Sequence, residues 1–379
     1  MSRVLIVGPA WPLRAGGMAT FNERMAYCLQ EQGHEVEIIT FSMQYPGWLF
    51  PGKTQLSDEP APEGLTIRVL LHALNPMNWL LTARYVKRYQ ADFLILRYWM
   101  PFMAPCLGMV SFWSSLMGSK ARRIALADNI IPHESFPLSR GLTNFFLSQT
   151  DAAATLSDSV RTDLMAHGYR KPSVRLKHPL YDNFGEPVDR ETACKALGLD
   201  PEFTYFLYFG FIRAYKGLDL LLEAFSDARL RSQNVRLIVA GEFYESPDRY
   251  QRIIEENQLA PDLVLMTRFI RNDEVRFLFS AAQLVTQTYH HATQSGVTQV
   301  GFHYNTPMLV TDVGGLAELV DHNHSGYVCE PKAAKIADCM VDFLQFERYN
   351  EMSARVAVKK REFSWDVFVR QLLSVGLPA

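Results

Sequence analysis

A strand, a helix and a second strand follow one another within the first 39 residues of the chain. Val4–Val7 is a short apolar run, the apolar residues from Met18 to Leu29 recur at helical spacing up to Gly33, and residues 35–39 form a second strand-like run. This βαβ order is typical of a parallel sheet, whose ligands lie at the carboxyl ends of the strands. The first half of the chain is therefore predicted to be α/β.

The same alternation restarts after Gly185–Pro187. It predicts helices over Leu218–Phe225 and Ile336–Leu344, and strands at residues 205–209, 235–240, 264–266, 284–286 and 308–311. Because single hydrophobic cores stop growing near ~250 to 300 residues, a chain of 379 residues is expected to divide. We predict two Rossmann-like domains, residues 1–183 and 184–362, with a linker near residues 180–188.

The end of the chain is predicted to return to the N-terminal domain. Residues 363–379 carry an amphipathic helical pattern. The apolar face of this helix consists of Trp365, Phe368, Val369 and Leu372.

Composition and charge exclude some classes of protein. The chain is 48% hydrophobic and 21% charged, which is ordinary for a soluble globular protein. Residues 1–183 carry 18 Lys/Arg and 14 Asp/Glu, whereas residues 184–379 carry 20 and 26. So small a basic surplus argues against nucleic-acid binding, but it is compatible with an N-terminal domain that rests on an anionic membrane.

The cysteines and the N-terminus predict a cytoplasmic protein. The five cysteines are an odd number without a Cys-x-x-Cys pair, which suits reduced thiols. Val4–Val7 is too short for the apolar region of a signal peptide. We therefore expect a cytoplasmic location, with contact to the inner face of a membrane left open.

One stretch, Tyr98–Ser119, contains no charged residue and is long enough to span a bilayer. However, Pro101, Pro105 and the serines near residue 114 would leave polar groups to satisfy in hydrocarbon. We predict a buried or interfacial segment rather than a transmembrane helix.

The loop between the first strand and the first helix contains Gly16 and Gly17. Backbone amides of such a loop can receive a phosphate or a sugar hydroxyl without obstruction by a side chain. The glycines do not match G-x-G-x-x-G, so a nicotinamide fingerprint is not indicated. A flexible turn is the alternative.

A more specific motif is the segment from Phe209 to Gly217, which contains Arg213 and Lys216 and separates a predicted strand from a predicted helix. A sugar nucleotide releases a diphosphate, so its reaction needs positive charge where negative charge develops. Arg213 and Lys216 at a strand end fit that need. Two solvated surface cations are the alternative.

A third motif, with the residues Ser295, Gly296, Val297 and Thr298, follows the predicted strand at residues 284–286 and opens a helix. Backbone amides in this turn would form a second anion site. An ordinary N-capping serine is the alternative.

Together these motifs resemble the retaining glycosyltransferases of family 4, the glycosyl transferases group 1. The resemblance includes Gly16-Gly17, Gly33-His34, Gly210-x-x-Arg213-x-x-Lys216-Gly217, Thr306-Pro307 and the segment from Thr311 to Glu318 with its Gly-Gly pair. It extends to Gly326 and Phe363-Ser-Trp365 and so spans nearly the whole chain.

This resemblance implies an α/β fold of the GT-B type, with two Rossmann-like domains whose parallel sheets face an interdomain cleft. It implies that the N-terminal domain binds a saccharide or lipid-linked acceptor, that the C-terminal domain binds a nucleotide diphosphate-sugar, and that neither a metal nor a cofactor is needed. By position, Arg213 and Lys216 would hold the diphosphate. Further donor-binding candidates are Gly16, Gly17, Gly241, Glu242, Ile270, Ser295, Gly296, Val297, Thr298 and Glu318.

The sequence departs from the family pattern at two places. The family often carries two glutamates that are separated by seven residues, and their positions hold Ala292 and Val300. Contact with the ribose is then left to Gln299 or Glu242. The histidine commonly seen in the N-terminal domain is replaced by Asp128. We interpret the chain as a member of a subgroup of the family that lacks the usual paired glutamates.

Asp128 and His133 are the catalytic candidates. A carboxylate can face the positive charge that develops at an anomeric carbon, and a histidine titrates near neutral pH. A structural turn is the alternative for His133, which follows Pro132.

The acceptor side is indicated by a basic amphipathic pattern from Trp79 to Arg88 and by the uncharged stretch behind it. Both could contact a membrane or pack as buried helices. The sequence therefore predicts a hexosyl-type transferase of polysaccharide or glycolipid assembly. A nucleotide-sugar epimerase and a sugar-nucleotide-binding protein without turnover are the alternatives.

Overall fold

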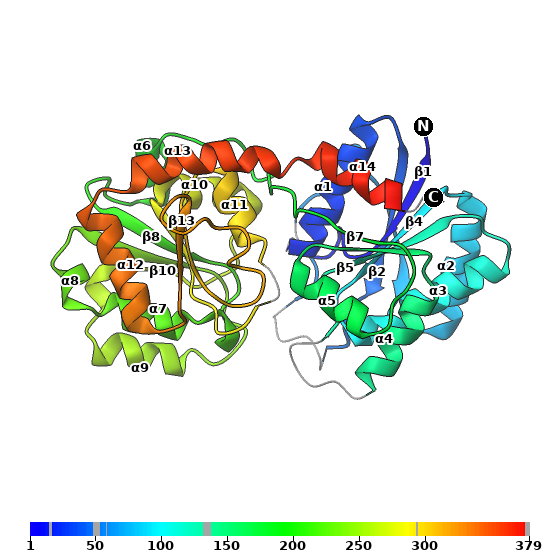
Figure 1. The fold of residues 1–379 in the computed structure, drawn as a ribbon, viewed down its shortest axis with the longest axis horizontal. Coiled ribbons are helices and arrows are strands. Elements are labelled where there is room, and N and C mark those ends of the chain that lie inside the picture. Colours follow the sequence, from blue (N-terminus) through cyan, green and yellow to red (C-terminus); the bar gives the residue numbers. More distant parts are fainter. Residues whose placement is uncertain (15–16, 48–53, 58, 132–137, 293–294, 376–379) are drawn as a thin grey trace. The chain divides into compact units, whose positions relative to one another are not determined.

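The computed structural model describes residues 1–379 except 15–16, 48–53, 58, 132–137, 293–294 and 376–379. The chain forms two compact units (Figure 1). The first consists of Met1–Pro179 together with Phe363–Ala379, and the second of Leu180–Glu362. The chain therefore crosses between the units twice, after Pro179 and after Glu362.

The first unit is built on a seven-stranded sheet in the order β3-β2-β1-β4-β5-β6-β7, and every neighbouring pair is parallel. Its strands are β1 Arg3–Val7, β2 Glu35–Met43, β3 Thr66–His72, β4 Phe93–Tyr98, β5 Arg122–Ala127, β6 Ala152–Thr155 and β7 Ser173–Arg175. Its helices are α1 Gly17–Glu31, α2 Pro76–Tyr89, α3 Ala104–Leu116, α4 Ser139–Ser148, α5 Asp158–Ala166 and α14 Trp365–Val375.

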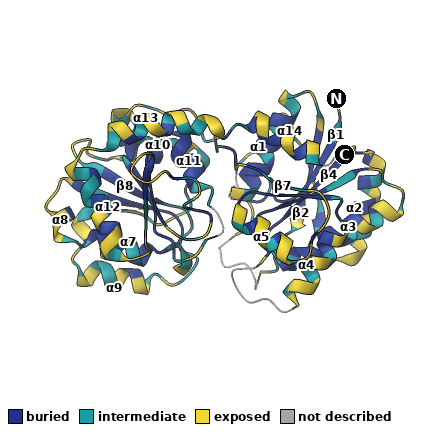
Figure 2. Cartoon of the chain, in the orientation of Figure 1, coloured by how far each residue is buried: buried dark blue, intermediate teal, exposed yellow. Residues whose placement is uncertain are grey.

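The central strands of this sheet are buried and mostly apolar. All six residues of β4 are buried, as are the last four residues of β1 (Figure 2). Strands that are covered on both faces read as continuous apolar runs instead of alternating patterns. This is why Val4–Val7 could be recognised in the sequence.

Helix α14 packs on α1 in the first unit. The ring of Phe21 on α1 lies 4.9 Å from that of Trp365 and 5.5 Å from that of Phe368. Gln32 adds a hydrogen bond of 3.2 Å from its side-chain amide to the carboxylate of Asp366. The apolar face of the last helix thus belongs to the core of the first unit.

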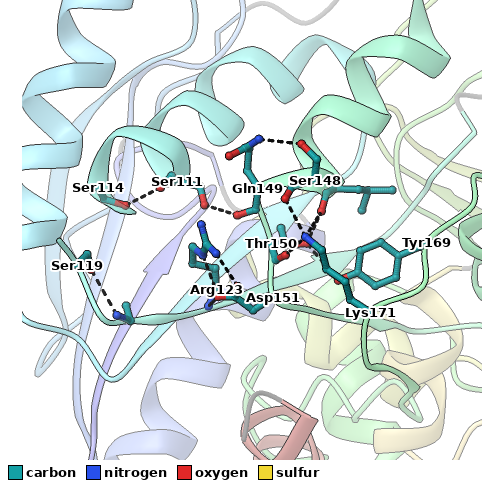
Figure 3. Close-up of polar contacts among 12 residues, drawn as sticks. Ser111, Ser114, Ser119, Arg123, Ser148, Gln149, Thr150, Asp151, Tyr169 and Lys171 are labelled. Atoms are coloured by element: carbon teal, nitrogen blue, oxygen red, sulfur yellow. Dashed lines mark hydrogen bonds and ion pairs between the residues drawn. The ribbon is translucent and has the colours of Figure 1, made fainter. Parts of the chain in front are cut away.

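The uncharged stretch Tyr98–Ser119 forms the end of β4, a short 3-10 turn and α3, and its two buried serines donate hydrogen bonds to backbone carbonyls (Figure 3). Ser111 donates a hydrogen bond of 2.6 Å to the carbonyl of Gln149, and Ser114 donates one of 2.9 Å to the carbonyl of Ser111. Both serines are buried. Among the described residues, no helix is long and apolar enough to cross a membrane.

The second unit contains a six-stranded parallel sheet in the order β10-β9-β8-β11-β12-β13. Its strands are β8 Thr204–Phe209, β9 Val235–Ala240, β10 Leu263–Met266, β11 Leu284–Gln287, β12 Met308–Thr311 and β13 Gly326–Cys329. Its helices are α6 Arg190–Leu197, α7 Leu218–Phe225, α8 Ala228–Arg231, α9 Asp248–Glu256, α10 Asn272–Ala281, α11 Val297–His303, α12 Ala333–Gln345 and α13 Tyr349–Lys359. The prediction of two parallel-sheet α/β domains is confirmed.

Candidate functional site

The strand order of the second unit reverses at β8. From β8 the chain proceeds first to β9 on one side and later to β11 on the other. In open parallel sheets, ligands bind at such a reversal, outside the carboxyl ends of the strands. The segment that follows β8 carries Arg213 and Lys216. The two predicted cations therefore lie where this architecture places its ligand.

Two glycines allow the loop after β8 to approach its neighbours. Gly217 has a φ of +64°, and a Cβ there would lie 1.9 Å from the carbonyl oxygen of Thr288. A Cβ on Gly241 would lie 2.0 Å from the carbonyl oxygen of Gly210. Because no side chain can be accommodated at either place, the approach of these loops requires glycine.

The loop after β9 supports one side of this segment. The amide of Ile212 donates a hydrogen bond of 2.8 Å to the carbonyl of Glu242, and the amide of Ala214 donates one of 2.7 Å to the carboxylate of Glu245. The Arg213 guanidinium lies 5.2 Å from the ring centroid of Tyr244, which is within range of a cation–π interaction. The predicted donor residues Gly241 and Glu242 thus adjoin Arg213.

The loop after β11 supports the other side. Thr288 donates a hydrogen bond of 2.7 Å from Oγ1 to the carbonyl of Gly217, and the amide of His290 donates one of 2.7 Å to the carbonyl of Tyr215. Between them, the ring of Tyr289 lies 5.6 Å from Lys216 Nζ. Lys216 is thereby held between the ends of β8 and β11.

Arg213 and Lys216 place two positive charges three residues apart after β8. Neither Arg213 nor Lys216 forms an ion pair within the described ranges of the chain. Burial lowers the pKa of Lys216, Arg213 lowers it further, and Tyr215 opposes both. Two adjacent cations, one of them partly desolvated, form a site that an anion would stabilise.

A pH dependence follows from the lowered pKa of Lys216. Only the protonated amine attracts a diphosphate, so affinity for a nucleoside diphosphate is expected to fall as pH rises, and to do so at a lower pH than that at which an ordinary lysine loses its charge. Lys216→Arg, which stays protonated, should bind with little change as pH rises. Calorimetric titration at several pH values tests this, and parallel curves for the two proteins would contradict it.

The Ser295 turn is tied to the end of β11. Ser295 Oγ accepts a hydrogen bond of 2.6 Å from the side-chain amide of Gln287 and one of 3.3 Å from the amide of Val297, and it lies 3.2 Å from the hydroxyl of Tyr289. Thr298 donates one of 2.6 Å to the side-chain carbonyl of Gln287. Gly296 precedes the short helix α11, which begins at Val297. Tyr289 therefore contacts both this turn, through Ser295, and Lys216.

The other predicted donor residues are more dispersed. Ile270 is buried after β10, and Glu318 is exposed in the turns after β12. Both strands are two positions away from β8, on opposite sides. Gly17 is the exposed first residue of α1 in the other unit. Gly16 lies outside the described residues, and the assignments of all four to the donor stay predictions.

Asp128 occupies a buried ion pair in the first unit, and His133 lies outside the described residues. Both oxygens of Asp128 accept hydrogen bonds from Arg97, at 2.7 Å from Nε and 2.5 Å from Nη2. Burial raises the pKa of Asp128, whereas the charge and hydrogen bonds of Arg97 lower it in part. Asp128 therefore has a structural role as the partner of Arg97 in a buried ion pair. Its catalytic role stays a prediction.

Gln299, one candidate for contact with the ribose, is fully buried. Neither of its side-chain polar atoms has a hydrogen-bond partner among the residues that are described. Gly296, just before α11, and His303, at its end, are three residues before and four residues after Gln299, so both lie on the same side of the helix as Gln299. A Cβ on Gly296 would lie 2.5 Å from the ring of Tyr181, and His303 Nε2 is 3.3 Å from the carbonyl of Gly185. Gln299 therefore faces the segment that enters the second unit.

Four site residues of this region are not predicted from the sequence: Gln287, Tyr289, His290 and Asp219. The spacing of His290 does not match a metal-ligand motif such as H-E-x-x-H, so that kind of motif does not single it out. The signal that could have found three of them is the polar and aromatic run Gln287-Thr-Tyr-His290 at the end of a predicted strand.

Comparison with known proteins agrees with this geometry. Residues 204–345 match the sequence model of the family "Glycosyl transferases group 1". The chain is 30% identical over 206 residues to the D-inositol 3-phosphate glycosyltransferase of Gordonia bronchialis, which covers 50% of the chain and 43% of that relative. The chain thus matches less than half the length of this curated relative.

Solved structures resemble the chain over nearly its full length. Sucrose-phosphate synthase from Thermosynechococcus elongatus has a TM-score of 0.77 at 14% identity and covers 98% of both chains. HepE of Anabaena, in complex with UDP and glucose, has a TM-score of 0.74 at 14% identity and covers 99% of both. Residues 204–345 are therefore a glycosyl transferases group 1 domain, and the two parallel-sheet domains have the fold of the GT-B glycosyltransferases.

Proposed function

We propose that the protein is a retaining glycosyltransferase that moves a sugar, of the hexosyl type, from a nucleotide diphosphate-sugar to a saccharide or lipid-linked acceptor in polysaccharide or glycolipid assembly. The observation that carries the proposal is the pair Arg213 and Lys216, two cations without an acidic partner among the described residues, at the carboxyl end of β8. The leaving diphosphate gains negative charge as the glycosidic bond breaks. Cations that are already in place stabilise that charge without reorganisation.

The donor is proposed to be a nucleotide sugar because the group 1 domain contains this cationic loop. HepE of Anabaena holds UDP and glucose in its crystal structure. We therefore take UDP-glucose as the first donor to test, together with guanosine and adenosine counterparts. A thermal-shift screen with the three nucleoside diphosphates and their sugars would identify the base, and no shift with any of them would contradict the proposal.

Retention of configuration and independence of metals are parts of the proposal that rest on the resemblance of the motifs. The anomeric coupling constant in the proton NMR spectrum of the first product, recorded before mutarotation, distinguishes retention from inversion. Activity is expected to persist in EDTA. Loss of activity in EDTA and its recovery with added Mg²⁺ would instead favour a metal-assisted reaction.

Two other functions are separated from this one by the products formed without an acceptor. A nucleotide-sugar epimerase would yield the epimeric nucleotide sugar, whereas a transferase yields slow hydrolysis to free sugar and nucleoside diphosphate. A binding protein without turnover would yield neither. Ala292 and Val300, at the positions of the usual glutamates, are the residues that motivate this last alternative.

The acceptor side is proposed to contact an anionic membrane from the cytoplasm, through α2 and α3 of the first unit. Both helices lack acidic residues. Their exposed apolar side chains are Met77, Leu81, Phe112 and Leu116, at 68%, 57%, 38% and 67% exposure, and exposed basic residues on or next to the two helices are Arg84, Arg88 and Lys120. Apolar side chains flanked by cations suit the boundary between headgroups and acyl chains.

Acidic residues introduced at this surface are expected to abolish binding to vesicles that contain phosphatidylglycerol. In the double variant Leu81→Glu and Leu116→Glu, the apolar contact is lost and the added charges repel the anionic lipid. The matched control is Phe346→Glu with Val358→Glu, which changes two residues of the second unit at 57% and 64% exposure. Co-flotation with the vesicles at low and high salt measures the binding. Equal binding of both variants would contradict the proposal that α2 and α3 contact the membrane.

A further inference from the structure

Asp219 is a buried carboxylate next to the proposed diphosphate site. It lies in the first turn of α7, two residues after Gly217, and is 4% exposed. Its oxygens each lie 3.1 Å from Nε2 of His290, and one of them also accepts from Arg249. Asp219 therefore joins the start of α7 to the loop after β11.

The His290 side chain extends a set of contacts that its backbone begins. The amide of His290 is bonded to the carbonyl of Tyr215, and Thr288 is bonded to the carbonyl of Gly217. The rings of Tyr215 and Tyr289 meet edge to face, with their centroids 6.1 Å apart. Each residue from Thr288 to His290 thus contacts the loop that carries Lys216, and the His290 side chain also contacts Asp219 on the helix that follows this loop.

We propose that the Asp219–His290 pair positions Lys216 for the diphosphate. The inference rests on the proposed function and adds to it a residue pair that does not touch the substrate. The pair fixes the loop after β11 against the loop after β8, and Lys216 Nζ is located by both: it lies 5.6 Å from the Tyr289 ring, and a Cβ on Gly210 would lie 3.1 Å from it. Without this hydrogen bond, the ammonium group would be free to occupy positions that the phosphates do not reach.

A side chain at position 290 that cannot reach Asp219 should weaken the part of the binding affinity that comes from the phosphates. His290→Ala is expected to weaken the binding of uridine diphosphate about tenfold while the binding of uridine changes less than about twofold. The guanosine or adenosine pair replaces this probe if the screen selects another base. His290→Gln, whose amide can still donate to Asp219, should recover most of the loss. Calorimetric titration of both probes gives the ratio of the two affinities.

The neighbouring histidine supplies the control. His291 is exposed, and His291→Ala should leave both affinities unchanged. If His290→Ala does not fold, Asp219→Asn weakens the same contact, and an unchanged ratio in that variant overturns the inference. Equal weakening of uridine and uridine diphosphate, or no recovery in His290→Gln, would also overturn it.

The failure of this inference differs from failure of the proposed function. Binding of the diphosphate that is lost in Lys216→Ala but unchanged in His290→Ala would remove the positioning role alone. A wild-type protein that binds none of the three nucleoside diphosphates would overturn both proposals.

Discussion

Replacement of Lys216 by alanine is expected to lower kcat/KM for the nucleotide sugar about 100- to 1000-fold, the loss seen when one preorganised group that stabilises developing charge is removed. The effect should be large because Lys216 is partly desolvated, as its lowered pKa reflects, and because Tyr289 and the end of β8 hold it in place. A cation in a site from which water is excluded interacts more strongly with a charged group than the same cation in water.

The loss should appear mainly in kcat, since the charge on the diphosphate increases as the glycosidic bond breaks. Lys195, which is exposed on α6 of the same unit, provides the control, and Lys195→Ala should keep wild-type rates. Steady-state rates of nucleoside diphosphate release measure both variants. A decrease of less than about threefold in Lys216→Ala would contradict the assignment of the diphosphate site.

The fold was largely predictable because the central strands are covered on both faces. Leu237–Ala240 and Met308–Val310 are apolar runs, and the structure has β9 over Val235–Ala240 and β12 over Met308–Thr311. Other strands lack this signal. β6 is Ala-Ala-Ala-Thr, whose three alanines are depleted in strands, and β7 has only three half-buried residues. Their pairing with β5 and with each other, not their sequence, makes them strands.

The candidate site was predictable where its signal is local. Arg213, Lys216 and the glycines around them stand together after one strand, so a short motif reveals them. The contact between His290 and Asp219 joins residues that are 71 positions apart. In the sequence, Asp219 is typical of the acidic residues that stabilise the N-terminus of a helix. That pattern does not indicate that it contacts His290, which follows a strand later in the chain.

Asp128 illustrates the same limit for the first unit. The sequence shows the carboxylate of Asp128 but does not indicate that it pairs with Arg97, which is 31 residues earlier. The two side chains meet because β4 and β5 are neighbours, with Arg97 in register with Leu126. A carboxylate that is charged and paired in this way is first a structural residue, and its contribution to folding can be measured apart from any contribution to turnover.

Arg97→Ala is expected to destabilise the first unit by about 3 to 5 kcal/mol, because it removes the cation of a buried ion pair. The variant also loses the contact between the guanidinium and the ring of Phe21, which are 4.2 Å apart. The double variant Arg97→Met with Asp128→Leu removes both charges and should recover much of the loss. Arg123→Ala breaks a more exposed pair, with side chains that are 22% and 21% exposed, and should cost roughly 1 kcal/mol.

The tryptophans allow this effect to be assigned to one unit. All six of them lie in residues 1–179 or 363–379, so the fluorescence change in urea reports the unfolding of the first unit and not of the second. Turnover of the same variants then distinguishes the two roles of Asp128. Because a structural role moves the unfolding midpoint and the catalytic role moves kcat, an Asp128→Asn protein with an unchanged midpoint and no activity would make Asp128 a catalytic residue. A lowered midpoint, with wild-type turnover in the folded fraction, would leave the ion pair with Arg97 as its task.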